Sequence, residues 1–166
     1  MNTQWLSPGE LAAWVRFIGV VELLPGVLDG QLRRDAQLTH FDYYVLAQLS
    51  EAPAHTLRMT ALAERTAASL ARLSHVVQRL ENRGLLERFP CPQDRRATNA
   101  RLTEAGRLKV EQSAPGHVAT VREYVIDALT PEQIGQLAES SETILRRLDP
   151  GGDRAVTYRR YDPPSM

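Results

Sequence analysis

Residues 85–103, LLERFPCPQDRRATNARLT, contain two short strand-like segments separated by a charged loop. Leu85–Phe89 and Ala97–Leu102 each have the length of a strand. The loop between them, Pro90–Arg96, holds two prolines and three charged side chains, which is typical of an exposed turn. The stretch therefore predicts a β-hairpin whose charged tip projects from the protein.

Two short helices joined by a tight turn are predicted immediately before this hairpin. Thr60 is placed to cap the first, and the turn falls near Thr66–Ala68. The second helix runs from about Ser69 to Arg83, and Gly84 suits a left-handed cap at its end. Its inner stripe is formed by Leu73, Val77 and Leu80. Two helices followed by a hairpin make a winged helix-turn-helix, a DNA-binding arrangement.

The exposed face of the second helix carries hydrogen-bond donors, which a helix needs to read base edges in the major groove. An arginine at the hairpin tip suits the neighbouring minor groove, where negative potential is concentrated. The alternative is that the arginines are ordinary solvated side chains and that Ser69 is only a helix cap. The predicted readers on the helix are Ser69, Arg72, His75 and Arg79.

Longer helices are predicted on both sides of this unit. Ser7, followed by Pro and later Glu, opens a helix that Pro25–Gly26 is expected to kink, and Thr39 caps the next one. After the hairpin, Thr103 caps a helix that Pro115–Gly116 is expected to interrupt. Thr130 opens a last helix through residue 148. The predicted class is mainly α with a small β-hairpin wing.

Charge is distributed unevenly although the 166 residues carry no net charge. Residues 58–109 hold eleven Lys/Arg and five Asp/Glu, giving +6, and the remainder holds nine and fifteen, giving −6. A basic segment within an acidic chain is the pattern expected of a surface that binds phosphates. Charge clustering on solvated helices is the alternative.

The wing sequence resembles that of the MarR (multiple antibiotic resistance regulator) family of winged helix-turn-helix transcription regulators. The run Asp94-Arg95-Arg96-Ala97-Thr98-Asn99-Ala100-Arg101-Leu102-Thr103, with Gly106 after it, is similar to that family's Asp-x-Arg, Leu-Thr and Gly pattern. Arg72-Leu73-Ser74-His75 and Arg79–Leu85 resemble its recognition helix and exit. The resemblance covers about residues 10–148.

The resemblance implies a homodimer that binds a pseudo-palindromic site on double-stranded DNA and is often released by a small ligand. It makes Arg96 the minor-groove arginine and Asp94 the carboxylate that orients it, while Arg95 and Arg101 are plausible phosphate contacts. Residues 7–36 and 104–148 become the helical dimerisation region, 37–103 the DNA-binding lobe and 149–166 a polar, poorly ordered tail. Apolar faces on the first and last helices also favour a dimer.

An effector pocket is expected where the dimerisation helices meet the lobe, offering aromatic surface and a few polar groups. Its effector would be a small aromatic or phenolic compound. The alternative is that these side chains only pack in the core and the dimer. The candidate lining residues are Trp14, Phe17, His40, Tyr43, Tyr44 and His117.

Other functional classes find little support in the sequence. No catalytic motif is present, the four histidines lack metal-ligand spacing, and no cofactor, metal or enzymatic activity is expected. Cys91 is the only cysteine, so a redox switch with a resolving thiol cannot form within the chain. No export signal or uninterrupted apolar run long enough for a membrane is found, which favours the cytoplasm. A protein-interaction module that has lost DNA binding is the competing function.

Overall fold

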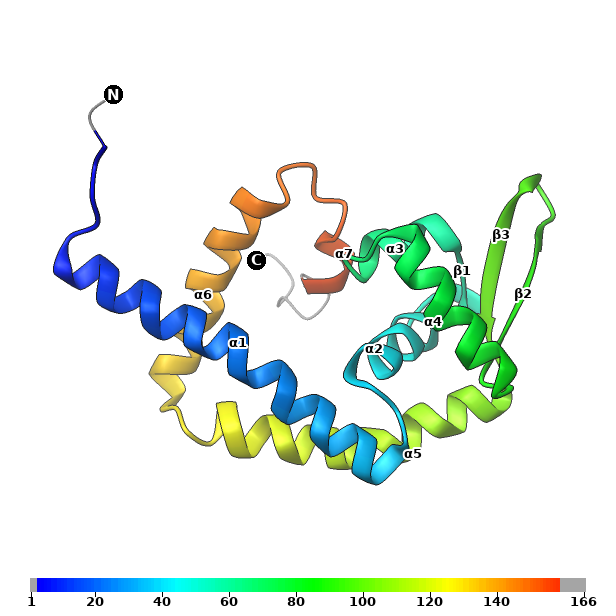
Figure 1. The fold of residues 1–166 in the computed structure, drawn as a ribbon, viewed down its shortest axis with the longest axis horizontal. Coiled ribbons are helices and arrows are strands. Elements are labelled where there is room, and N and C mark those ends of the chain that lie inside the picture. The colour runs from blue at the N-terminus through cyan, green and yellow to red at the C-terminus, as the bar shows by residue number, and fades with distance from the viewer. Residues whose placement is uncertain (1–2, 159–166) are drawn as a thin grey trace, which may run out of the picture.

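The computed structural model describes residues 3–158, in which a winged lobe is joined to long helices (Figure 1). The helices and strands are, in chain order, α1 Pro8–Ala36, α2 His40–Ser50, η1 Pro53–His55, β1 Thr56–Arg58, α3 Met59–Arg65, α4 Leu70–Asn82, β2 Leu86–Cys91, β3 Asp94–Leu102, α5 Glu104–Val121, the π-helical turn η2 Arg122–Ile126, α6 Pro131–Leu148 and α7 Ala155–Tyr158.

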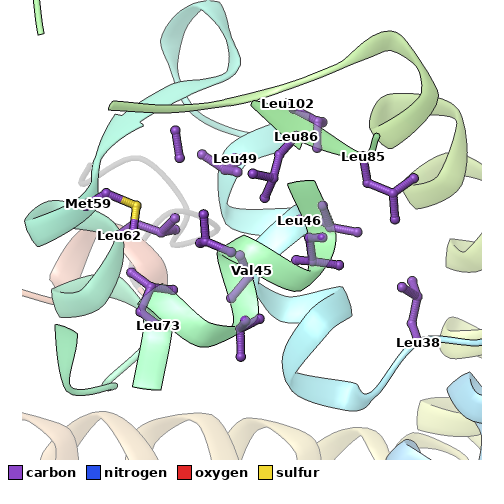
Figure 2. Packing of buried hydrophobic residues seen from close by; sticks show 14 of the residues in the cluster. Leu38, Val45, Leu46, Leu49, Met59, Leu62, Leu73, Leu85, Leu86 and Leu102 are labelled. Atoms are coloured by element: carbon purple, nitrogen blue, oxygen red, sulfur yellow. The ribbon is translucent and has the colours of Figure 1, made fainter. Parts of the chain in front are cut away.

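The lobe formed by α2, α3, α4 and the three strands encloses the main hydrophobic core. Its sheet is antiparallel with the order β1-β3-β2, and Leu86 of β2 pairs with Leu102 of β3. The side chains of Leu46, Leu62 and Leu73 have no exposed surface and belong to one buried cluster within the lobe (Figure 2). The predicted mainly α class with a hairpin wing, the winged helix-turn-helix, is confirmed.

The long helices are far less covered. The C-terminal part of α1 packs along α5, whereas the N-terminal part of α1 and the whole of α6 project from the lobe (Figure 1). No residue of α6 is buried. Large apolar side chains are therefore left exposed, among them Leu11, Trp14, Val15, Val20, Leu23, Leu137, Ile144 and Leu148.

Helix starts agree with the sequence where a side chain caps the backbone. Ser7, Thr39 and Thr130 each form a reciprocal capping box, and Thr103 accepts a hydrogen bond from the backbone of Gly106. Gly84 has the predicted left-handed conformation, with a φ of 70°. These caps satisfy backbone N–H groups that the first turn of a helix leaves without partners.

Several predicted boundaries were wrong. The first helix of the helix-turn-helix begins at Met59, so Thr60 lies inside it and does not cap it. The strands extend beyond the predicted limits, so Asp94, Arg95 and Arg96 belong to β3. The predicted interruption at Pro115–Gly116 does not occur, since α5 continues to Val121.

The polar C-terminal segment is ordered further than expected. Residues 155–158 form α7, and the guanidinium Nε of Arg154 donates to the carbonyl oxygen of Glu64 in α3 at 3.0 Å. The Tyr158 hydroxyl donates to Asp149 at 2.8 Å. The remainder of the predicted tail, residues 159–166, lies outside the described residues.

One helix also corrects the expectation about membranes. By length and composition alone, α1 is long and apolar enough to cross a bilayer, and only 6% of its apolar window is buried. The apolar residues of α1 do not form one uninterrupted run, because Arg16 and Glu22 divide them. The uncovered face of α1 therefore requires an explanation, and a partner helix is one that fits.

Candidate nucleic-acid interface

The exposed surface of α4 is fixed by its buried stripe. Ser69 caps the helix by accepting a hydrogen bond from the backbone of Arg72 at 3.2 Å, and Ala67 makes the preceding turn with a φ of 54°. The stripe facing the core is Leu73, Val76, Val77 and Leu80. At 3.6 residues per turn, the residues opposite it are Ala71, His75, Gln78 and Asn82, all exposed.

Arg72 and Arg79 lie on one flank of α4, beside the N-terminus of α2. The guanidinium of Arg72 sits 4.2 Å from the ring centre of Phe41. Arg79 forms an ion pair with Asp42, whose carboxylate also accepts from the backbone N–H of Thr39 at 2.9 Å. Because Asp42 is only 2% exposed, Arg79 compensates a buried charge in addition to any role at the surface.

The opposite flank of α4 faces the wing. Leu70 and Ser74 line a hollow of about 230 Å³ together with residues of the sheet and of α3. Arg88 forms an ion pair with Glu81 at 2.7 Å and also donates to Gln78. The hollow lies between the helix and the wing, and three arginines line it: Arg58, Arg88 and Arg96.

The wing leaves two arginines unengaged. No ion pair or hydrogen bond of the Arg95 or Arg96 side chain is formed within residues 3–158. Asp94 accepts from the backbone N–H of Arg96 at 3.1 Å and lies 3.9 Å from a guanidinium nitrogen of Arg58. The Asp94 carboxylate thus holds the wing backbone, and it does not contact the Arg96 guanidinium that it was predicted to orient.

The Arg101 side chain contacts other residues of the sheet. It forms an ion pair with Glu87 at 2.6 Å, and its guanidinium lies 5.0 Å from the ring centre of Phe89. Sequence reasoning also missed Gln78, which shares the outermost face of α4 with His75. Gln78 could have been identified from its position three residues after His75, because residues three apart lie on the same face of a helix.

Cys91 is buried, contrary to its expected place in an exposed tip. Its thiol donates to the side-chain oxygen of Gln93 at 3.2 Å and receives a hydrogen bond from Arg58 at 3.5 Å. The pKa of the thiol is lowered, chiefly by a hydrogen bond with the backbone of Gln93. A hydrogen bond with the backbone of Asp94 and the nearby Arg58 guanidinium lower it further, whereas burial raises it.

Only three of the six predicted pocket residues come together. The rings of His40 and His117 are 6.1 Å apart, and Tyr43 lies 4.7 Å from His117, between α2 and α5. Burial lowers the pKa of both histidines and raises that of Tyr43. Two buried polar atoms nearby, Nδ1 of His117 and Oε1 of Gln31, have no partner among the described residues.

The other three predicted pocket residues lie elsewhere. The hydroxyl of Tyr44 donates to the carbonyl oxygen of Arg65 at 3.1 Å. Gly116, the neighbour of His117, packs against Gln31 of α1. Trp14 and Phe17 lie about 25 Å and 21 Å before Gln31 along the same helix. Within residues 3–158, no group of three or more His, Cys, Asp or Glu side chains could hold a metal ion.

A helix-turn-helix with a hairpin wing, framed by long helices, defines a winged helix-turn-helix protein. The chain belongs to the MarR family, whose model matches residues 38–98. It is 41% identical to Sco3205 from Streptomyces coelicolor, a MarR family transcriptional regulator solved in complex with DNA. That match covers 89% of this chain and 92% of Sco3205, with a TM-score of 0.85.

Two further relatives agree with this assignment. AbsC, a MarR family transcriptional regulator from Streptomyces coelicolor, is 40% identical over 88% of this chain and 98% of its own, with a TM-score of 0.83. The uncharacterised HTH-type transcriptional regulator YdcH of Bacillus subtilis is 33% identical over 88 residues. The chain spans 60% of the length of YdcH.

Proposed function

We propose that this protein is a sequence-specific DNA-binding transcription regulator that acts as a homodimer. The observation that carries the proposal is the similarity to Sco3205, which was solved in complex with DNA and aligns over most of both chains. The geometry supports the same function, because the outermost face of α4 is exposed and the wing presents two unengaged arginines. α4 enters the major groove, and Arg96 reaches the minor groove beside it.

The contacts divide by chemistry. His75 and Gln78 lie where base edges would be, and Ser69 and Arg72 border them. Arg95 has the exposure needed for a phosphate contact, whereas Arg79 and Arg101 must share their charge with Asp42 and Glu87. Phosphate contacts set position and base contacts set sequence preference.

A second copy of the chain explains the exposed apolar surface. Leu23, Leu24 and Val27 of α1 and Tyr124 of η2 line an apolar groove of about 380 Å³. Helix α6 is amphipathic yet contains no buried residue. When the partner's helices cover these faces, each Å² of apolar surface removed from water stabilises the dimer by about 25 cal/mol. Residues 7–36 and 104–148 are then the dimerisation region, and residues 37–103 are the DNA-binding lobe. In this proposal the dimer binds DNA in the cytoplasm, and α1 packs against a partner helix and does not cross a membrane.

Regulation completes the proposal. The dimer represses transcription by occupying its site, and a small aromatic or phenolic ligand releases it. The place that supports such a ligand is the junction of α2 and α5, where Tyr43, His40 and His117 offer aromatic surface and an unpartnered ring nitrogen. The protein performs no catalysis in this scheme.

A binding selection on randomised DNA duplexes tests the function. We expect enrichment of one sequence with two related half-sites, bound by a dimer. Heat-denatured protein serves as the control for nonspecific capture. If the folded protein enriches no sequence and shows no salt-dependent affinity for duplex DNA, the alternative of a protein-interaction module on this fold is favoured.

A further inference from the structure

A hollow of about 450 Å³ lies on the flank of α4 that faces away from the wing. Three helices form it: α1 through its C-terminal turn, α2 through its N-terminus, and α4 through its C-terminal half. The lining contains three arginines and one carboxylate, and consists of Arg33, Gln37, Leu38, Thr39, Asp42, Arg79 and Arg83.

The arginines retain unused donors. Each guanidinium has five N–H groups. Arg33 donates through Nε to Asp29, and Arg79 donates through one terminal nitrogen to Asp42. Arg83 donates at 3.0 Å to the carbonyl oxygen of Gln37, which carries no charge. The positive charge of Arg83 is therefore not neutralised by any described residue, and all three groups can donate to a further acceptor.

We propose that Arg33, Arg79 and Arg83 bind a phosphate of the DNA backbone, on the strand opposite to the one that the wing approaches. The inference rests on the proposed function and extends it with two residues, Arg33 and Arg83. Both had no predicted role, because nothing in their local sequence indicates that α1 and α4 meet.

The position of the hollow selects DNA as the source of the phosphate. The major groove is about 12 Å wide and a helix with its side chains measures about 10–12 Å across. A helix inserted in the groove therefore brings its two flanks against the two phosphate backbones. One flank of α4 faces the wing through Leu70 and Ser74, and the other carries Arg79 and Arg83. The N-terminus of α2 adds partial positive charge on the same side.

Two charge-neutralising variants test the site. Arg83→Gln keeps a donor for the Gln37 carbonyl, and Arg33→Gln keeps one for Asp29. Arg79 is left intact, because removing it would leave Asp42 uncompensated. The matched control is Arg146→Gln on α6: Arg146 forms the same i,i+4 ion pair as Arg33, and its side chain is 67% exposed against 62% for Arg33.

Affinity is measured by fluorescence anisotropy between 50 and 200 mM salt, on a duplex recovered by selection and on a scrambled duplex. Each lost phosphate contact should lower the log-log salt slope by about 0.9. Between 50 and 200 mM salt, the ratio of the variant's Kd to the wild-type Kd should therefore fall about 3.5-fold for each lost contact. The loss should be equal on both duplexes, because phosphates carry no sequence information. Arg146→Gln should match the wild type.

Methylphosphonate substitution locates the contact. Neutralising single phosphates of the selected duplex should weaken wild-type binding at a few positions, and Arg83→Gln should be insensitive at one of them. Unchanged slopes in both variants, beside a steep wild-type slope, would overturn the phosphate site while leaving the proposed function intact. A wild type that does not bind duplex DNA overturns both.

Inorganic phosphate distinguishes the second source of the same chemistry. It is titrated at constant ionic strength while the Nε–H resonances of Arg33 and Arg83 are followed by NMR. Resonances that shift at millimolar phosphate, together with variant salt slopes equal to that of the wild type, would assign the hollow to small anions and overturn its assignment to DNA.

Discussion

The winged lobe and the projecting helices differ in how completely one chain buries its apolar side chains. In the lobe, Leu46, Leu49 and Leu80 have no exposed surface. Along α1 and α6, residues of the same type such as Leu23 and Leu148 are more than 70% exposed. The lobe is thus complete within one chain, whereas the long helices carry apolar faces that a second copy would cover.

The largest expected effect comes from deleting the same side chain in the two regions. Leu49→Ala should lower the free energy of unfolding by about 2–5 kcal/mol, because it leaves a cavity at a position with no exposed surface. Leu23→Ala, at a position 73% exposed, should act mainly through the concentration-dependent part of stability. Urea unfolding at several protein concentrations measures both. Equal losses at the lowest concentration would break the contrast.

Dimerisation itself is tested by placing a charge in the apolar groove. Leu23→Glu should raise the dissociation constant of the dimer at least tenfold, about 1.4 kcal/mol, because the carboxylate must be desolvated on association. Analytical ultracentrifugation gives the constant, and circular dichroism shows whether the lobe remains folded. Gln112→Glu, which adds the same charge at an exposed position of α5, should have no effect. A wild type that sediments as a monomer at micromolar concentration would contradict the dimer.

Arg79 tests whether an arginine at the surface of the lobe stabilises the fold. Arg79→Ala should destabilise the fold by about 1–3 kcal/mol, because the buried carboxylate of Asp42 loses its charged donor. Arg72→Ala should cost much less, since its contact is a cation–π interaction at an exposed site. Thermal unfolding compares the two. Equal stability of Arg79→Ala and the wild type would show that Asp42 does not depend on the ion pair.

Local chemistry explains which parts of the fold could be predicted. Ser7, Thr39, Thr103 and Thr130 were recognised as helix caps because a cap and its partner lie three residues apart. The hairpin loop was predicted too long, from Pro90 to Arg96, because its prolines and charged residues suggested a loop, whereas only residues 92 and 93 lie between the strands. Strand β2 lies at the edge of the sheet, where a proline is tolerated, so pairing with β3 continues to Cys91.

Tertiary contacts explain what the sequence could not reveal. Pro115 removes one helical donor, yet α5 continues because it packs along α1, with Gly116 against Gln31. The pairing of Arg79 with Asp42 joins residues 37 positions apart, so its charge looked free for DNA. Six residues were predicted to line one pocket, and only His40, Tyr43 and His117 come together. Trp14 and Phe17 could not be excluded, because the sequence does not indicate where α5 lies along α1.

The wing and α4 should differ in what their arginines contribute to DNA binding. Arg96→Ala should weaken binding to most sequences, chiefly those with A·T-rich flanks, because minor-groove width matters there more than base identity. Arg72→Ala should also relax the preference at one base position in each half-site, an effect of about 1–3 kcal/mol. Selections on randomised duplexes with each variant measure this. If Arg96→Ala binds every duplex as tightly as the wild type, the wing does not read DNA.

The smallest expected effect is at Cys91, a buried residue beside the hairpin turn of the wing. Its thiol is enclosed by Gln93 and Arg58 and is only 2% exposed. The lowered pKa of the thiol favours reaction with oxidants, but burial keeps them away and the chain has no second cysteine to form a disulfide. A serine hydroxyl can make the same two hydrogen bonds. Cys91→Ser should therefore leave DNA affinity and its response to mild peroxide unchanged, as measured by anisotropy before and after treatment. Release of the wild type by peroxide, with the serine variant still bound, would instead make the wing a redox sensor and show that Cys91 becomes accessible in solution.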